Sequence, residues 1–117
     1  MLDVYGIKNC NTVKKALAWL DEHGIDYRFH DFKREGVDED QLRRWVDQFG
    51  WEALLNRKGL TWRRLSEEER ARVNDAEAAM ALMREKPTII KRPVVERDGE
   101  AILLGFDADA YAEALGG

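Results

Sequence analysis

The stretch LDVYGIKNCNTV, residues 2–13, decides how this chain begins to fold. An apolar run over residues 2–5 ends at Gly6, which is typical of a short strand. From Asn11 onward the apolar residues recur at helical spacing. They are Val13, Ala16, Leu17 and Leu20. The stretch therefore predicts a strand, a loop and a helix, with Cys10 between the strand and the helix.

The next segment completes a strand-helix-strand unit. Gly24 follows His23 at the place where a helix commonly ends in a glycine. Residues 27–32 then alternate between apolar and polar side chains, which predicts a second strand. Residues 3–31 thus have about the length that a right-handed parallel crossover needs.

The middle of the chain is predicted to be all helical. One apolar face, formed by Leu42, Trp45, Val46 and Phe49, runs along residues 38–49 and stops at Gly50. Further helical patterns cover residues 52–55, 66–73 and 75–84, and the third of these four helices starts with the capping-box sequence of residues 66–69. We expect the core of this region to contain Leu42, Trp45, Phe49, Trp51 and Trp62.

The last part of the chain returns to strands. Residues 88–90, 94–97 and 101–104 read as short strands, and Asp98-Gly99 is a strong hairpin signal between the last two. A final helix is expected over residues 107–115. The order βαβ, helices, ββα is that of an α/β thioredoxin-like fold with a mixed four-stranded sheet. We predict one domain over residues 1–117, with a helical insert at about residues 36–86 between its two halves.

Composition narrows the classes of function. Charged residues make up 36% of the chain, but the net charge is only −4, which disfavours general nucleic-acid binding. No apolar run is long enough to span a membrane, and no secretion signal is evident, so we expect a cytoplasmic protein. The single cysteine cannot form an internal disulfide, which agrees with a reducing compartment.

Cys10 is the first candidate functional residue. At the start of a helix, unpaired amide groups and the helix dipole stabilise an anion, and cysteines placed there commonly have a pKa well below that of a free thiol. Asn11 or Thr12 can cap the helix, and Lys8 adds positive charge nearby, as do Lys14 and Lys15. The alternative is that Cys10 is a small buried residue without chemical importance.

The cysteine and histidine residues of the sequence suggest neither a second reactive thiol nor a metal site. Val13 stands three residues after Cys10, so there is no Cys-x-x-Cys pair and a resolving thiol must come from another molecule. His23 and His30 are the only histidines, and we expect them to flank helix and strand ends rather than to bind a metal.

Arg92-Pro93 is the second candidate feature. In the thioredoxin topology a cis proline precedes the hairpin strand and packs beside the redox cysteine, so we predict a cis bond before Pro93. Arg92 would then bring its guanidinium toward the thiolate and could pair with an oxyanion or a carboxylate. The alternative for Arg92 is a solvated surface side chain. The polar turn of residues 56–59 contains Arg57, which could face either the cysteine or water.

Four segments resemble the arsenate reductase-like (ArsC/Spx/YffB) family, most closely its YffB-type members. They are residues 5–16, 23–27, 54–59 and 90–95. The resemblance covers nearly the whole chain and implies a thioredoxin fold with a helical insert. It also implies a nucleophilic cysteine at Cys10 and a cis proline at Pro93.

The chain departs from two activities of that family. True arsenate reductases of this class hold the oxyanion with three arginines, of which only Arg92 has a match here. Asn56 and Gly105 occupy the other two positions, although Arg57 is adjacent to the first. Spx-type regulators contact RNA polymerase and sense oxidation through a Cys-x-x-Cys pair, which Val13 removes.

The leading hypothesis is therefore a glutathione-dependent thiol oxidoreductase. Cys10 would attack a disulfide or an oxidised substrate, and glutathione or a glutaredoxin would resolve the adduct. Glutathione would act as a co-substrate, with no bound cofactor or metal. Candidate residues for binding the substrate or glutathione are Lys8, Asn11, Thr12, Arg57, Arg92 and Pro93. The alternatives are an arsenate reductase-like oxyanion reductase and a non-catalytic, Spx-like regulator that binds a protein partner.

Overall fold

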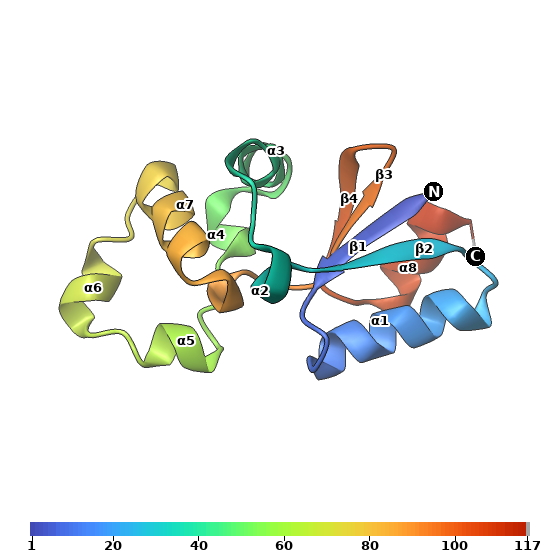
Figure 1. The fold of residues 1–117 in the computed structure, drawn as a ribbon, viewed down its shortest axis with the longest axis horizontal. Helices are drawn as coiled ribbons and strands as arrows, with labels where there is room; N and C mark the ends of the chain where they lie inside the picture. Colours follow the sequence, from blue (N-terminus) through green and yellow to red (C-terminus); the bar gives the residue numbers. More distant parts are fainter. Residues whose placement is uncertain (117) are drawn as a thin grey trace. The chain divides into compact units, whose positions relative to one another are not determined.

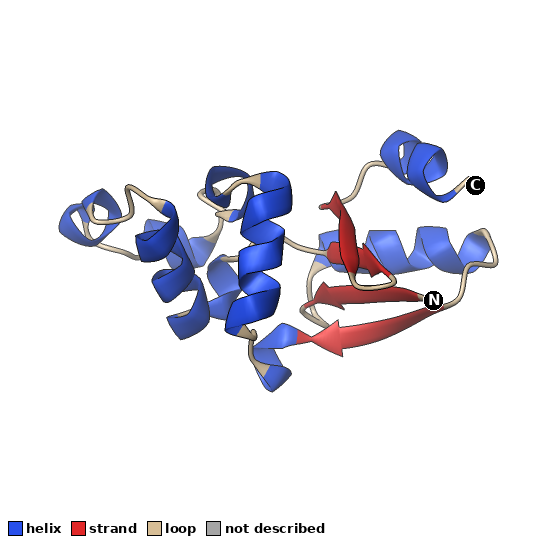
Figure 2. Ribbon diagram, turned by 90° about the horizontal axis from the view of Figure 1, so that it is seen from above, coloured by secondary structure: helices blue, strands red, loops and turns tan. Residues whose placement is uncertain are grey.

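The computed structural model describes residues 1–116, which fall into two compact units. We call Met1–Glu35 together with Arg92–Gly117 the sheet unit, and Gly36–Lys91 the helical unit. Figure 1 shows the elements of each unit, and Figure 2 distinguishes the strands from the helices. The helical unit covers the segment that the sequence predicts as an insert.

The sheet unit is built on one mixed four-stranded sheet with the strand order β2-β1-β3-β4. β1 pairs with β2 in parallel and with β3 antiparallel, and β3 pairs antiparallel with β4. The strands are β1 (Leu2–Gly6), β2 (Tyr27–Asp31), β3 (Val94–Arg97) and β4 (Glu100–Leu104). This sheet confirms the predicted thioredoxin-like topology.

Three helices belong to the sheet unit: α1 (Asn11–Glu22), α2 (Phe32–Glu35) and α8 (Ala108–Leu115). α1 and α8 pack on the same face of the sheet, because they share one core with alternate strand residues. That core contains Leu2, Val4, Ala16, Leu20, Val95, Leu103 and Tyr111. Burial raises the pKa of the Tyr111 phenol, which donates a hydrogen bond of 2.6 Å to the Gly105 carbonyl.

The other face of the sheet holds a buried carboxylate. Asp3 accepts two hydrogen bonds from Arg28 on the neighbouring strand, at 3.0 and 3.2 Å, and one from His30 at 2.9 Å. Burial opposes ionisation of Asp3, but these hydrogen bonds and charges outweigh it and lower its pKa. The ring of His30 also stacks on Tyr5, with 4.5 Å between the ring centroids.

The hairpin between β3 and β4 forms as the sequence predicts. Asp98 and Gly99 both have positive φ, at 52° and 83°. A two-residue turn of this kind matches the right-handed twist of the strands that it joins.

The helical unit contains five helices and one 3-10 turn within its described residues. They are α3 (Glu39–Phe49), α4 (Trp51–Leu54), α5 (Leu60–Arg63), α6 (Glu67–Ala71), α7 (Ala76–Glu85) and η1 (Pro87–Ile89). The predicted capping box at Ser66 and Glu69 is present, with both of its hydrogen bonds at 3.0 Å. The four-residue helix α5 was not predicted.

The predicted strand at residues 88–90 is wrong. Pro87 lies at the start of the 3-10 turn, where its fixed φ suits a helical conformation. The N–H of Ile90 then bonds to the Pro87 carbonyl at 3.0 Å. Ile90 forms an isolated bridge with Leu55 and belongs to none of the strands found within residues 1–116.

The predicted core of the helical unit is only partly confirmed. Leu42 and Trp45 are fully buried. Phe49, Trp51 and Trp62 are half-buried. The difference between these groups follows from position: Leu42 and Trp45 lie on the inner face of α3, whereas Trp51 and Trp62 belong to two short helices that flank an exposed turn. Across residues 1–116, no helix has the length and apolar character needed to cross a membrane.

Candidate thiol site

Cys10 lies between the end of β1 and the start of α1, as the sequence predicts. Its N–H donates to the Ile7 carbonyl at 3.2 Å, which closes the loop after the strand. Its carbonyl accepts the N–H of Lys14 at 3.0 Å, which is the first hydrogen bond of the helix. Cys10 therefore occupies the N-cap position. The expectation that Asn11 or Thr12 caps the helix is wrong, since both already belong to its first turn.

Gly6 allows the helix to start this close to the strand. A Cβ atom on Gly6 would lie 2.8 Å from Cγ2 of Val13, which is closer than real carbon contacts allow. Val13 is fully buried and anchors the first turn of α1 in the core. The loop that carries the thiol is thus fixed by a tight contact between the strand end and the helix.

The surroundings of the half-buried thiol favour its ionised form. Burial raises the pKa of Cys10, but hydrogen bonding from the N–H of Val13, the positive charge of Arg92 and hydrogen bonding from the N–H of Thr12 together outweigh it. The net effect lowers the pKa below that of an ordinary cysteine. The Cys10 side chain makes no capping hydrogen bond of ordinary geometry, so the amides of Val13 and Thr12 act on the sulfur mainly through their dipoles.

Arg92 is the cation that acts on the sulfur. Its guanidinium contributes to the lowered pKa both through its charge and through a hydrogen bond to the Cys10 side chain. The Arg92–Pro93 peptide bond is cis, which confirms the geometry predicted from the sequence. The carbonyl of Pro93 accepts the N–H of Gly105 at 2.8 Å, so the segment before β3 is tied to the end of β4.

The other candidate residues lie in two places. Lys8, Asn11 and Thr12 are exposed on the loop and the first turn around the thiol. Arg57 belongs to the helical unit, where its guanidinium carbon lies 5.9 Å from the ring centroid of Trp51 and 5.8 Å from that of Trp62. Two cation–π contacts therefore hold Arg57, and its role toward the thiol stays a prediction.

Sequence reasoning missed the part that Val13 plays. In the sequence, Val13 showed only that no Cys-x-x-Cys pair is present. In the structure, its backbone N–H is the leading group that lowers the pKa of Cys10. The general rule that the N-cap side chain faces the amides two and three positions later could have identified Val13.

Both histidines contact neighbouring groups of the fold and lie at the end of a helix or a strand. His23 ends α1, where its Nδ1 lies 2.8 Å from the Trp19 carbonyl and its ring stacks on Trp19. His30 contacts Asp3, and its second ring nitrogen lies 3.7 Å from a Glu35 oxygen. Residues 1–116 contain no group of three or more His, Cys, Asp or Glu side chains placed to hold a metal ion.

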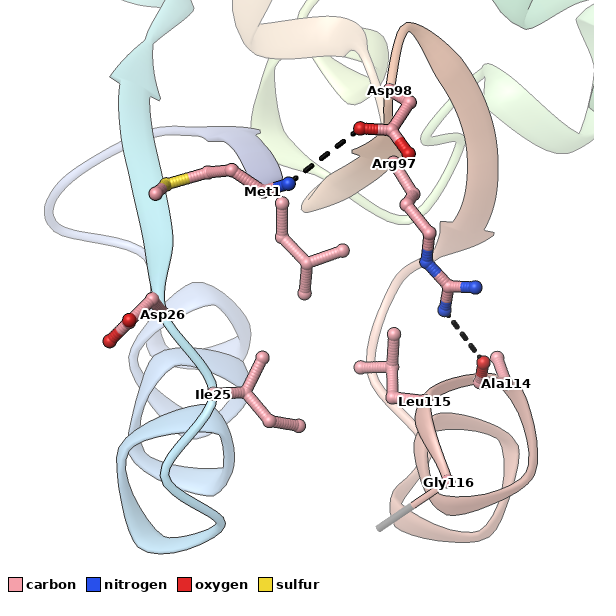
Figure 3. Close-up of a pocket in the computed structure, with 9 residues that line it drawn as sticks. Met1, Ile25, Asp26, Arg97, Asp98, Ala114, Leu115 and Gly116 are labelled. Atoms are coloured by element: carbon pink, nitrogen blue, oxygen red, sulfur yellow. Dashed lines mark hydrogen bonds and ion pairs between the residues drawn. The ribbon is translucent and has the colours of Figure 1, made fainter.

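A hollow at the other end of the sheet has its basic groups already engaged (Figure 3). It lies where β1 starts, whereas Cys10 follows the end of β1. The Met1 amine is 3.6 Å from the Asp98 carboxylate, and Arg97 donates to the Ala114 carbonyl at 2.7 Å. The thiol site is therefore the better candidate for chemistry.

The fold and the thiol site together define a thioredoxin-like protein with a single cysteine at the start of its first helix. The model of the ArsC family matches residues 5–114, and the chain belongs to this family. It is an arsenate reductase-like and Spx-like protein, as the resemblance in its sequence implies.

Several relatives and solved structures match the chain over nearly its whole length. An uncharacterized protein of Haemophilus influenzae is 45% identical over 115 residues, which cover 98% of this chain and 99% of the relative. A solved structure of a protein called YffB is 50% identical, with a TM-score of 0.91 and coverage of 98% of this chain and 99% of the other. An arsenate reductase (ArsC) related protein from Brucella melitensis is 49% identical, with a TM-score of 0.76 and coverage of 97% and 93%. Global transcriptional regulators named Spx are more distant, for example one of Lactococcus lactis at 23% identity over 93% of this chain and 84% of its own.

Proposed function

We propose that the protein is a glutathione-dependent thiol oxidoreductase that uses Cys10 as its nucleophile. The observation that supports this most is the lowered pKa of Cys10, which results from the amides of Val13 and Thr12 and from Arg92. A thiolate is the nucleophile in thiol–disulfide exchange, so a lowered pKa increases the reactive fraction at neutral pH.

The reaction needs one protein thiol and an external one. The Cys10 thiolate attacks one sulfur of a substrate disulfide, so that a bond from Cys10 to that sulfur forms while the substrate S–S bond breaks. The departing sulfur leaves with the electron pair as a thiolate and takes up a proton. When the sulfur retained on Cys10 is that of glutathione, a second glutathione thiolate attacks this adduct and releases the Cys10 thiolate together with oxidised glutathione. The net change is reduction of the mixed disulfide between substrate and glutathione to the substrate thiol, while one glutathione thiol is oxidised to give oxidised glutathione.

The residues around the thiol would have different roles in this reaction. Arg92 would pair with the departing thiolate or with a carboxylate of glutathione, because a guanidinium suits both anions. Lys8, Asn11 and Thr12 would contact the bound tripeptide from the exposed loop and the first helical turn. The backbone at Pro93 and the guanidinium of Arg57 are the remaining candidate contacts. The reducing cytoplasm, where glutathione is abundant, is the proposed location.

Incubation with oxidised glutathione tests the proposal. Mass spectrometry of the intact protein is expected to find one glutathione on wild-type protein and none on Cys10→Ser. Addition of reduced glutathione should remove the adduct and restore the free thiol. Failure to form the adduct at neutral pH, in protein that alkylating reagents still modify at Cys10, would contradict the proposal.

A regulator that binds a protein partner is the second candidate, favoured by the relatives named Spx. The two candidates differ in what they require of the sulfur. A regulator of this kind would retain RNA polymerase subunits in a pull-down with Cys10→Ser as well as with wild-type protein. The oxidoreductase would lose all turnover with the same substitution. An oxyanion reductase has less support, because a charge-assisted hydrogen bond is worth about 1.5–3 kcal/mol and Asn56 and Gly105 cannot replace two arginines.

A further inference from the structure

A groove on the sheet unit begins at the loop that carries the thiol. It is lined by Lys8, Leu17, Tyr27, Phe29, Asp31, Arg34 and Glu35, and it has a volume of about 430 Å³. This volume falls within the range of about 300–1,000 Å³ typical of ligand sites. The groove lies between α1 and β2, and Figure 2 shows β2 as the outermost strand of the sheet.

The floor of the groove is apolar and accessible. Leu17, Tyr27 and Phe29 pack against the core of the sheet unit but remain only half-buried. Tyr27 and Phe29 point to the same side of β2 because alternate residues of a strand share a face. β2 pairs with a strand on one side only, so its other edge can accept hydrogen bonds from an extended chain.

Charges of both signs line the rim of the groove, and its two cations suit an acidic ligand near the thiol. Asp31 already caps α2 by accepting the N–H of Lys33 at 3.0 Å, and Glu35 lies 3.7 Å from His30. The side chains of Lys8 and Arg34, in contrast, take part in none of the ion pairs found within residues 1–116. The first turn of α1 contains no acidic residue, and Lys14 and Lys15 are exposed there.

We propose that this groove binds an extended peptide segment of a protein substrate whose cysteine reacts with Cys10. The segment would carry an acidic residue beside its cysteine and an apolar residue three positions away. The spacing follows from the fold: Leu17 lies seven residues after Cys10, or about 10 Å along α1 at about 1.5 Å per residue. An extended peptide covers about 3.3 Å per residue, so its third residue from the cysteine reaches the apolar floor.

The proposal rests on the proposed thiol chemistry and specifies the substrate as a protein rather than only a small disulfide. It places the contact on the edge strand β2 and not on the segment of Pro93. The small-disulfide reaction and the peptide preference are separate observations, so each can fail without the other.

Short synthetic peptides with one cysteine, activated as 2-thiopyridyl disulfides, provide the test. Cys10 attacks the peptide sulfur, the bond to the pyridine sulfur breaks, and the leaving thiolate takes a proton to give pyridine-2-thione, whose absorbance gives the rate. One pair of peptides carries Asp beside the cysteine and Leu three residues before or after it. The control pair carries Lys and Ser at those positions. We expect one peptide of the first pair to react about tenfold faster than its control, as burial of one leucine-sized side chain allows.

Two variants locate the preference. Leu17→Gln keeps a good helix former but removes the apolar contact, and Arg34→Glu reverses a charge on the exposed end of α2. Both should reduce the preference to about twofold or less, while the thermal midpoint shows that the fold is retained. Bis(2-hydroxyethyl) disulfide, whose arms are too short to reach Leu17, measures the reactivity of the thiol itself in each variant.

The outcomes separate the two proposals. Equal rates for all peptides, in protein that still forms the glutathione adduct, would overturn the peptide groove and leave the oxidoreductase in place. A preference that persists in both variants would place the peptide elsewhere on the sheet unit and would also overturn the groove. Loss of the glutathione adduct itself would instead contradict the oxidoreductase. As a second measurement, the amide signals of Tyr27 and Phe29 should shift when a peptide with serine in place of cysteine is added to isotope-labelled protein.

Discussion

The two units of the molecule each hold an arginine that the sequence marks as a candidate for anion binding, but they hold it in different ways. In the sheet unit, Arg92 acts on the sulfur of Cys10 and helps to lower its pKa. In the helical unit, Arg57 lies over the rings of Trp51 and Trp62. Residue type and a polar turn therefore do not fix the role of a cation. Its role depends on the groups that the fold brings beside it.

The core of the helical unit, compared with the exposed turn of the same unit that holds Arg57, provides the test with the largest expected effect. Trp45→Ala in the helical unit should lower the free energy of unfolding by about 3–5 kcal/mol, because the side chain is fully buried and the cavity cannot collapse completely. Trp62→Ala should cost less than half as much, since Trp62 is half-buried. Urea denaturation followed by circular dichroism measures both. Equal losses would mean that the exposed turn around Arg57 contributes as much stability as the core of α3.

A buried carboxylate distinguishes the sheet unit from the ion pairs of the helical unit. Because the hydrogen bonds to Asp3 lower its pKa in the folded state, the stability it contributes is fully present above the pH of about 4 at which an unfolded aspartate titrates. That contribution is lost as the pH falls through the lower pKa of the folded state. Asp3→Asn should therefore cost about 1–2 kcal/mol at pH 7, and the difference from wild-type protein should shrink toward acid.

Glu77→Gln is the matched control in the helical unit. Glu77 pairs with Arg43 at 3.1 Å, but the two side chains are 73% and 48% exposed. Exposed pairs of this kind contribute about 0–1 kcal/mol, so the variant should unfold close to wild type at both neutral and acidic pH. Denaturation curves at several pH values compare the two substitutions. A loss as large as that of Asp3→Asn would contradict the contrast drawn between a buried and a solvated carboxylate.

The two arginines can be compared directly through the thiol. Arg92→Met should raise the pKa of Cys10, because loss of the adjacent positive charge disfavours the thiolate. Arg57→Met should leave the pKa unchanged, since the groups that lower it are Arg92 and the amides of Val13 and Thr12. The pH dependence of alkylation by iodoacetamide gives the pKa in each variant. A shift on substitution of Arg57 would assign it to the thiol site and remove the difference between the two cations.

Much of the sheet unit could be predicted because its signals are local and agree with one another. The strand before Gly6, the helix after Cys10 and the Asp98-Gly99 turn each carry their own pattern, and together they leave few possible topologies. The cis bond before Pro93 followed from that topology. The effect of Val13 on the pKa of Cys10 could not be predicted in the same way. It comes from the backbone N–H, which the residue type at that position does not reveal.

The helical unit was harder to predict, because the wrong predictions there depend on contacts between residues that are far apart in the sequence. The run at residues 88–90 has the composition of a strand. A strand forms, however, only where a second segment lies beside it and pairs with it. Similarly, apolar character alone cannot tell the buried Trp45 from the half-buried Trp51. The contact of Arg57 with two tryptophans joins two short helices and has no sequence spacing of its own.

Removal of a helix cap is expected to give the smallest loss of stability. One capped helix in each unit, at a place where the sequence predicts a helix and the structure has one, allows the comparison. Asp75 caps α7 in the helical unit by accepting the N–H of Ala78 at 2.8 Å, and Asp107 caps α8 in the sheet unit by accepting the N–H of Asp109 at 3.3 Å. Loss of such a cap commonly costs about 0.5–2 kcal/mol.

We expect Asp75→Ala to cost about 1 kcal/mol and Asp107→Ala about half of that, since the longer hydrogen bond of Asp107 is weaker. Asp75→Ser and Asp107→Ser are matched controls that keep a capping oxygen, and each should recover most of the loss measured by urea denaturation. If alanine and serine destabilise a helix equally, the carboxylate stabilises it through its charge near the helix N-terminus rather than through the hydrogen bond. Added salt would then reduce the difference from wild type, because screening weakens the interaction with the dipole but barely alters a short hydrogen bond.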